Sequence, residues 1–157
     1  MALTSEVAFL DTSVFVNGLI EIDPADPAQG LMDAIAKGAL GRPRTAWHCC
    51  LEFYSVATRL PAGLRISPAD AGQIVEEEIL GRCDVLDLPR ASRLSFVRTA
   101  VQEGIAGGRI HDAHIAEVAR AAGARVVLTE NRRHFVPLLR RGVRVLTATE
   151  YVDELKL

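Results

Sequence analysis

The stretch VAFLDTSVFVNGLI, residues 7–20, joins a short apolar run to an amphipathic segment through three polar residues. Residues 7–10 have the length and composition of a buried strand. Asp11, Thr12 and Ser13 are residue types that cap helices, so a helix is expected to follow over residues 14–20. A strand that passes directly into a helix, with an acidic residue at the junction, is typical of a protein that alternates the two elements.

The same alternation continues along the chain. Further strands are expected around residues 44–46, 83–88, 126–128 and 143–146, with helices over 30–38, 48–60, 67–80, 89–105, 112–122 and 135–140. Short apolar strands separated by helices predict an α/β fold with a mostly parallel central sheet of about five strands, covered on both faces. We expect one domain over residues 1–157, with a helical excursion at about 67–105.

Composition excludes several classes of protein. The chain has 157 residues, of which 49% are hydrophobic, enough for a sizeable core. Its three cysteines, two of them adjacent, do not suit a disulfide framework. No apolar run is long enough for a membrane span, and the N-terminus lacks the basic start of a signal peptide, so a cytoplasmic protein with no membrane partner is expected.

The formal net charge of −2 conceals an uneven distribution. Residues 1–39 contain six acidic residues and one lysine, whereas residues 120–144 contain seven arginines and one glutamate. Arginine suits bidentate contact with phosphate, so the bias permits a nucleic-acid partner. A GC-rich genome gives the same preference for arginine over lysine, so the bias alone does not establish one.

Four polar residues are expected to meet at one edge of the sheet: Asp11, Glu52, Asp112 and Asn131. Each follows a strand or lies near the start of a helix, and the carboxyl ends of parallel strands share one edge. An isolated acid at a helix start usually caps the helix. Carboxylates about 4 Å apart, however, repel by about 4 kcal/mol, and a shared cation relieves that cost. Hard oxygen ligands favour Mg²⁺ or Mn²⁺.

Four motifs then resemble one known family. They are FLDTSV (9–14), Leu51-Glu52 followed by Val56 and Arg59, IHDAHIA (110–116) and VLTENRRHF (127–135). Their order and spacing resemble those of the PIN-domain family, and in particular the VapC-type toxins of bacterial type II toxin–antitoxin systems. The resemblance covers nearly the whole chain.

The resemblance implies a Rossmann-like, three-layer α/β/α fold and a metal-dependent endoribonuclease. Asp11, Glu52 and Asp112 would form the acidic metal site, and Asn131 would take a fourth catalytic position where many relatives have Asp. In the expected mechanism Asp11 and Asp112 hold Mg²⁺ or Mn²⁺, and Glu52 orients or deprotonates the attacking water. Ser13 and Thr129 match polar positions that border the site in the family.

Partners are also implied by the resemblance. RNA, either tRNA or ribosomal RNA, is the expected substrate, and a cognate antitoxin and a second copy of the chain are the expected protein partners. Arg109 lies just before Asp112, and Arg132 and Arg133 lie just after the fourth strand. We expect them at the rim of the same sheet edge, where they are candidates for contact with RNA phosphates. For any one of them, a solvated surface charge is the more common role.

Two other functions compete with the nuclease. A non-catalytic module that binds RNA or a protein would retain the acids without using them, and Asn131 favours it. An aspartate-nucleophile phosphatase would need a second acid two residues after Asp11, where this chain has Ser13. A zinc site at His111 and His114 is disfavoured because no Cys or third His lies nearby, and His48-Cys49-Cys50 is expected to pack beneath the Glu52 helix.

Overall fold

One parallel sheet lies at the centre of the structure. A computed structural model describes residues 6–157, and the signal-peptide expectation rests mainly on residues 1–5, outside this range. The strands are β1 (Ala8–Leu10), β2 (Arg44–Ala46), β3 (Asp84–Leu86), β4 (Val126–Leu128) and β5 (Arg144–Leu146). They are ordered β3-β2-β1-β4-β5, and each neighbouring pair is parallel. The α/β class and the five-stranded parallel sheet are therefore confirmed.

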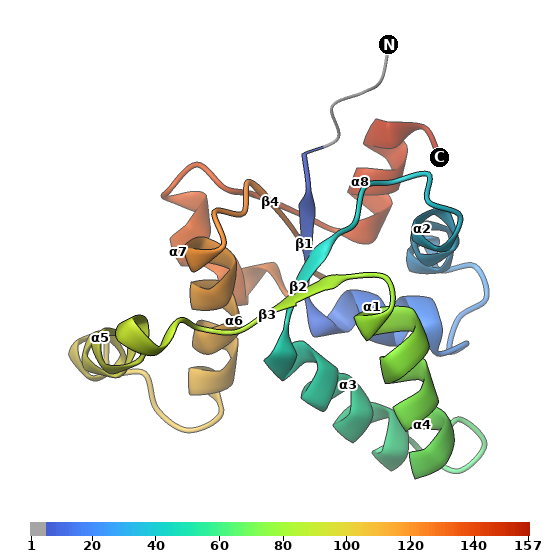
Figure 1. The fold of residues 1–157 in the computed structure, drawn as a ribbon, viewed down its shortest axis with the longest axis horizontal. Coiled ribbons are helices and arrows are strands. Elements are labelled where there is room, and N and C mark those ends of the chain that lie inside the picture. The colour runs from blue at the N-terminus through green and yellow to red at the C-terminus, as the bar shows by residue number, and fades with distance from the viewer. Residues whose placement is uncertain (1–5) are drawn as a thin grey trace.

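Helices cover both faces of this sheet. They are α1 (Thr12–Leu19), α2 (Pro27–Ala36), α3 (Trp47–Arg59), α4 (Pro68–Ile74), α5 (Arg90–Gln102), α6 (Arg109–Ala121), α7 (Val136–Leu139) and α8 (Ala148–Leu155). A π-helical stretch, η1 (Val75–Leu80), extends α4, and a 3₁₀ turn, η2 (Arg132–Phe135), precedes α7. Helices α1 to α4 and α8 lie on one side, and α5 to α7 lie on the other (Figure 1). The three-layer α/β/α arrangement is confirmed.

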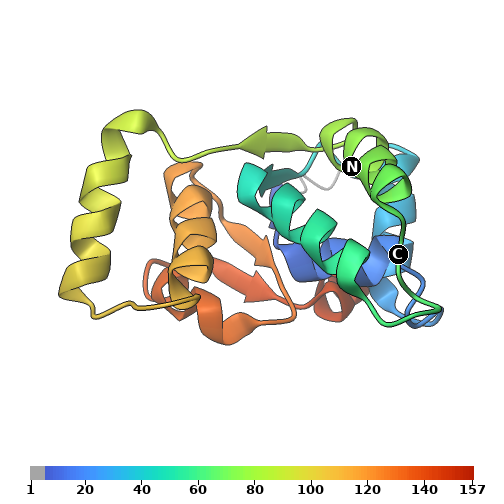
Figure 2. The ribbon, with the colours of Figure 1, turned by 90° about the horizontal axis from the view of Figure 1, so that it is seen from below.

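The helical excursion does not extend over all of residues 67–105. Strand β3 lies inside that range and forms the edge of the main sheet beside β2. Helix α5 alone stands away from the body, outside α6 (Figure 2). Only Ala100 of α5 is buried.

The prediction of the helices needs correction at three places. Helix α6 begins at Arg109 and not at residue 112. The prediction ends at the last strand and omits α8, although Thr147 and Glu150 form a capping box that starts this helix and Tyr151 anchors it in the core. Helix α2 begins at Pro27 and not at residue 30, because the Asp26 side chain accepts a hydrogen bond from the Ala28 amide and Pro27 is tolerated at the first helical position.

The order of the strands places a crevice between β1 and β4. From β1 the chain moves to β2 and β3 on one side, whereas β4 leads to β5 on the other. Ligands of open parallel sheets bind where the strand order reverses in this way, beyond the carboxyl ends of the strands. Asp11 directly follows β1 and Thr129 directly follows β4, so both residues lie at this point.

The core around the crevice is apolar and tightly buried. Phe9, Phe15, Phe53 and Leu128 are among its largest fully buried side chains. All three cysteines are free and buried. Within residues 6–157, no helix is both long enough and apolar enough to cross a bilayer.

Candidate active site

A pocket of about 780 Å³ opens at the carboxyl ends of β1 and β4. Its lining includes Asp11, Glu52, Asp112 and Asn131, which come from the β1–α1 junction, α3, α6 and the β4–η2 loop. The structure therefore brings together the four residues that the sequence predicts to meet. Ser13 lines the same pocket.

Asp11 is the most buried of these acids, with 6% of its surface exposed. It occupies the N-cap position of α1, but its side chain makes no capping hydrogen bond. Its Oδ2 instead accepts hydrogen bonds from Thr129 Oγ1 at 2.7 Å and from Ser13 Oγ at 3.0 Å. The Asp11 side chain therefore does not cap the helix, which is the usual role of an acid at this position.

The surroundings of Asp11 make its negative charge costly. Burial raises the pKa of Asp11, hydrogen bonds from Thr129 and Ser13 oppose that rise, and the charge of Glu52 adds to it. Across residues 6–157, Asp11 forms no ion pair. A carboxylate in this state is stabilised by a cation that enters the pocket.

Two hydroxyl groups connect Asp11 to the loop after β4. Thr129, which is fully buried, accepts a hydrogen bond from the Asn131 amide at 2.9 Å while it donates to Asp11. Ser13 accepts one from the Glu130 amide at 3.0 Å. This loop therefore has a fixed position relative to the Asp11 carboxylate, and Asn131 is directed to the pocket by backbone contacts.

Glu52 is held from two sides. Thr12 Oγ1 donates to Glu52 Oε2 at 2.6 Å, and His48 Nε2 lies 3.5 Å from Glu52 Oε1. His48 precedes Glu52 by four residues on α3, so the two side chains share one face of the helix. The carboxylate is half-buried and has a fixed orientation at the pocket wall.

Asp112 has a similar partner from another element. It lies in the first turn of α6, and His134 Nδ1, from η2, lies 3.3 Å from its Oδ1. Both residues line the pocket. Asp112 and Glu52 thus each lie beside one imidazole, at 3.3 Å and 3.5 Å respectively.

The donor set suits a hard divalent cation. Among residues 6–157, no three His, Cys, Asp or Glu side chains lie close enough together to hold an ion. Mg²⁺ typically takes only one or two protein carboxylates and completes its octahedron with water and substrate phosphate. Asp11 and Asp112 fit that pattern, whereas zinc needs three or four protein ligands.

Two more histidines, His111 and His114, lie near this site. The rings of His48 and His111 are stacked with centroids 4.9 Å apart, and His114 meets His48 edge-on at 5.5 Å. Burial lowers the pKa of His114, and the neighbouring His48 lowers it further. The i, i+4 spacing of His48 and Glu52 signals their contact in advance, but no local pattern places His134 beside Asp112.

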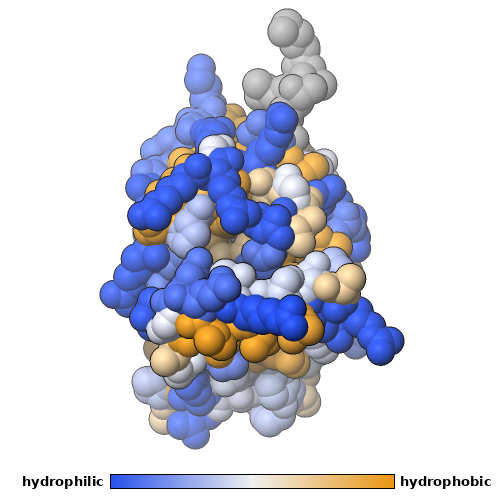
Figure 3. Space-filling model, turned by 90° about the vertical axis from the view of Figure 1, so that its left-hand side faces the viewer, coloured by the Kyte–Doolittle hydropathy of each residue, from blue (hydrophilic) through white to orange (hydrophobic). Residues whose placement is uncertain are grey.

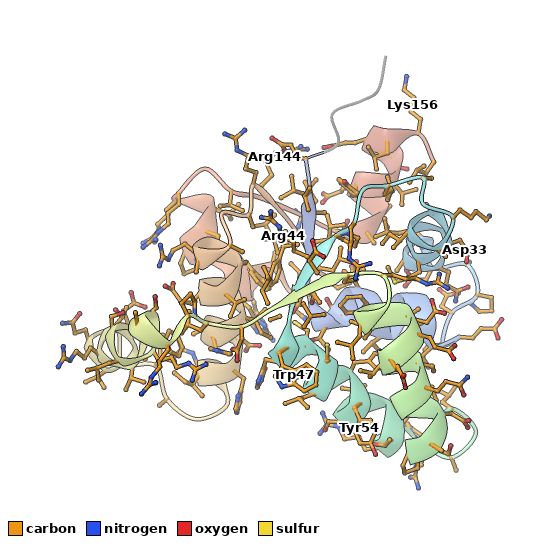
Figure 4. The ribbon with its side chains drawn as sticks, viewed as in Figure 1. Asp33, Arg44, Trp47, Tyr54, Arg144 and Lys156 are labelled. Carbon is orange, nitrogen blue, oxygen red and sulfur yellow. The ribbon has the colours of Figure 1, made fainter. Side chains whose placement is uncertain are left out.

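The three predicted arginines do not line the pocket. Arg109 and Arg133 border an adjacent groove, and Arg132 is paired with Glu150 of α8. Arg125 and Arg144 lie at the opposite end of the sheet, where both face Glu6 and Arg144 also binds Glu154 (Figure 4). Trp47 and Tyr54 are partly exposed on α3, at the end of the sheet that carries the pocket (Figure 4).

Comparison with known proteins identifies the family. Residues 7–133 match the PIN domain family. Ribonuclease VapC27 of Mycobacterium tuberculosis is 31% identical over 139 residues, which span 88% of this chain and 95% of that protein. The crystal structure of FitAcB from Neisseria gonorrhoeae has a TM-score of 0.59 at 20% identity and covers 91% of this chain and 99% of its own. VapBC-1 from nontypeable Haemophilus influenzae has a TM-score of 0.58 at 18% identity, with coverage of 91% and 98%. The chain belongs to the PIN-domain family.

Proposed function

We propose that the protein is a metal-dependent endoribonuclease and the toxin of a toxin–antitoxin pair. The observation that carries the proposal is the state of Asp11, a buried carboxylate that has no ion pair among residues 6–157. Thr129 and Ser13 hold it in one pocket with Glu52 and Asp112. The match to a relative named as a ribonuclease supports the reaction class.

The chemistry assigns a separate task to each acid. Asp11 and Asp112 would hold Mg²⁺ or Mn²⁺, which lowers the pKa of water and offsets charge on the phosphate. Glu52 accepts the proton of the attacking water at Oε1, while Thr12 holds its Oε2. The water oxygen bonds to phosphorus as the bond to one ribose oxygen breaks, and the leaving oxygen takes up a proton.

Protein partners are part of this proposal. The chain has the fold of FitAcB and VapBC-1. Its motifs resemble those of the VapC-type toxins, and this resemblance favours an antitoxin partner. Leu94, Val97 and Val101 form an apolar strip on α5, exposed by 59%, 53% and 75%, and hydrophobic side chains gather along α5 in Figure 3. Such a strip favours a second copy of the chain as a further partner. Light scattering of the purified chain tests the homodimer, which a monomer at all concentrations contradicts.

A divalent-ion titration separates the nuclease from a non-catalytic module. Mn²⁺ binding is measured by calorimetry on the wild type, on Asp112→Ala, and on Asp33→Ala, which removes an exposed acid of α2 far from the pocket (Figure 4). The proposal expects binding in the wild type and in Asp33→Ala and its loss in Asp112→Ala. If the wild type binds no Mn²⁺, the metal-dependent mechanism is wrong.

Mapping of RNA ends tests the reaction itself. We expect the 5′ ends of cellular RNA after expression of the wild type to show new, discrete sites in tRNA or ribosomal RNA. Expression of Asp11→Asn is expected to show none of them. The same sites in both samples, or no new sites with the wild type, would contradict the proposed activity.

A further inference from the structure

A second cavity, the α5–α7 groove, lies beside the pocket that holds the acids. It has a volume of about 660 Å³ and runs between α5, α6 and α7. Asp112 and His134 line both cavities, so the groove opens directly beside the proposed catalytic residues. Figure 3 shows a hollow on this side of the molecule, bordered by hydrophilic side chains above and by the apolar strip of α5 below.

Five arginines line the groove: Arg109, Arg120, Arg133, Arg140 and Arg141. Arg120 is neutralised by Glu117, which it contacts through two hydrogen bonds. The other four make no ion pair and no side-chain hydrogen bond within residues 6–157. These four guanidinium groups surround one cavity and repel one another, and an anionic ligand relieves that repulsion.

The acids of the groove do not cancel this charge. Glu117 is already paired with Arg120, and Asp112 lies beside His134. Glu103, at the end of α5, is the remaining acid of the lining. The groove therefore keeps a net positive charge next to an acidic pocket.

The floor of the groove is apolar. It contains Leu138, which is 3% exposed, and Ala100, which is 5% exposed. Phe96 and Ile105 are half-buried and lie on the α5 side, with the hydroxyl of Thr99 beside them. An apolar floor with a basic rim suits a ligand that has both a flat apolar part and an anionic backbone, as a nucleotide of a single strand does.

We propose that the α5–α7 groove binds a single-stranded segment of RNA adjacent to the cleaved bond, with its phosphates on Arg109, Arg133, Arg140 and Arg141. The inference rests on the proposed function, because it assigns the groove to the same substrate. Bases reach an apolar floor only when they are unpaired and unstacked, so this proposal requires a single-stranded substrate on this side of the cleavage site.

Binding without cleavage tests the groove separately from catalysis. Fluorescence anisotropy follows a labelled oligouridine of about 12 nucleotides in EDTA, where the proposed reaction cannot proceed. The groove variant is Arg140→Gln/Arg141→Gln. The matched control is Arg90→Gln/Arg125→Gln, which removes the same charge from exposed arginines outside the groove. Thermal melts establish that both variants are folded.

The expected result follows from counterion release. Each phosphate contact with a single strand contributes about 0.7 to the slope of log affinity against log salt, so loss of two contacts lowers the slope by about 1.4. Raising salt from 50 to 200 mM then weakens wild-type binding about 7-fold more than binding by the groove variant. The control is expected to keep the wild-type slope.

Two results would overturn the inference. One is a groove variant whose affinity and salt slope equal those of the control. The other is displacement of the oligouridine by polyglutamate as effectively as by unlabelled RNA, which would assign the groove to an acidic protein. Cleavage by Asp11→Asn, assayed separately with Mg²⁺, would contradict the proposed function and leave the groove result unaffected.

Discussion

Replacement of Thr129 by valine removes one hydroxyl group and keeps the shape of the side chain. Thr129 is fully buried and donates to Asp11 at 2.7 Å. A hydrogen bond to a charged group contributes about 1.5–3 kcal/mol. Loss of this donor therefore disfavours the ionised form of Asp11 by about this amount and raises its pKa further.

The pH dependence of cleavage reports this change. Burial already raises the pKa of Asp11, and the Thr129 hydrogen bond opposes that rise. Metal binding needs the ionised carboxylate, so without the hydroxyl the acidic limb of the rate–pH profile moves to higher pH, and at a fixed pH on that limb the rate falls by about 10- to 100-fold. The assay is the cleavage rate of a fluorogenic RNA across a pH range that spans neutrality, at one fixed Mg²⁺ concentration below saturation, so that protons and metal compete for Asp11.

Thr129→Ser is the matched control, because it keeps the hydroxyl and loses only a methyl group. It is expected to retain the wild-type profile. A thermal melt of Thr129→Val checks that the fold survives. If folded Thr129→Val has the wild-type profile, Thr129 does not tune Asp11 and the reasoning is refuted.

Three further predictions concern Asp11, Asn131 and Thr147. The pKa of Asp11 is raised in the folded state, so its contribution to stability is present below the ordinary value of 3.8 and is lost as the pH rises through the folded pKa. Urea unfolding is therefore expected to show that Asp11→Asn gains stability relative to the wild type between acid and neutral pH, and a constant difference would contradict this. Asn131→Asp adds a carboxylate to the pocket and is expected to tighten Mn²⁺ binding about tenfold, or about 1.4 kcal/mol, in calorimetry, with unchanged affinity as the contrary result. Thr147→Ala removes the capping box of α8 and is expected to cost about 1 kcal/mol and lower Tm by about 2–4 °C, whereas an unchanged Tm would show that α8 does not depend on its cap.

The sequence predicts where the pocket lies, because the position of the pocket follows from one geometric rule. Asp11 follows a strand, and Asp112 begins a helix whose apolar face, with Ile115 and Ala116, packs inward. In a parallel sheet such positions meet at one edge, so their convergence follows from local structure alone. In the structure Asp11 and Asp112 do line the same pocket.

Contacts between distant elements could not be predicted in the same way. Arg132 pairs with Glu150, and that contact requires α8, which the prediction omits. His134 reaches Asp112 only because η2 turns the chain back toward α6 after β4. The groove likewise exists because α5 stands away from α6, and hydrophobic periodicity does not predict how far apart two helices lie.

The most direct test of the central claim is cleavage of a single-stranded RNA by purified wild type and Asp11→Asn, each with Mg²⁺ and with EDTA. Because activated water attacks the phosphate, we expect the wild type to cut only with Mg²⁺ and to leave no 2′,3′-cyclic phosphate. Asp11→Asn is expected to be folded and to lose at least about 100-fold in rate, since even outer-sphere partners of a metal contribute 10–100-fold. Cleavage in EDTA, a cyclic phosphate product or full activity of Asp11→Asn would contradict a metal-dependent nuclease built on Asp11.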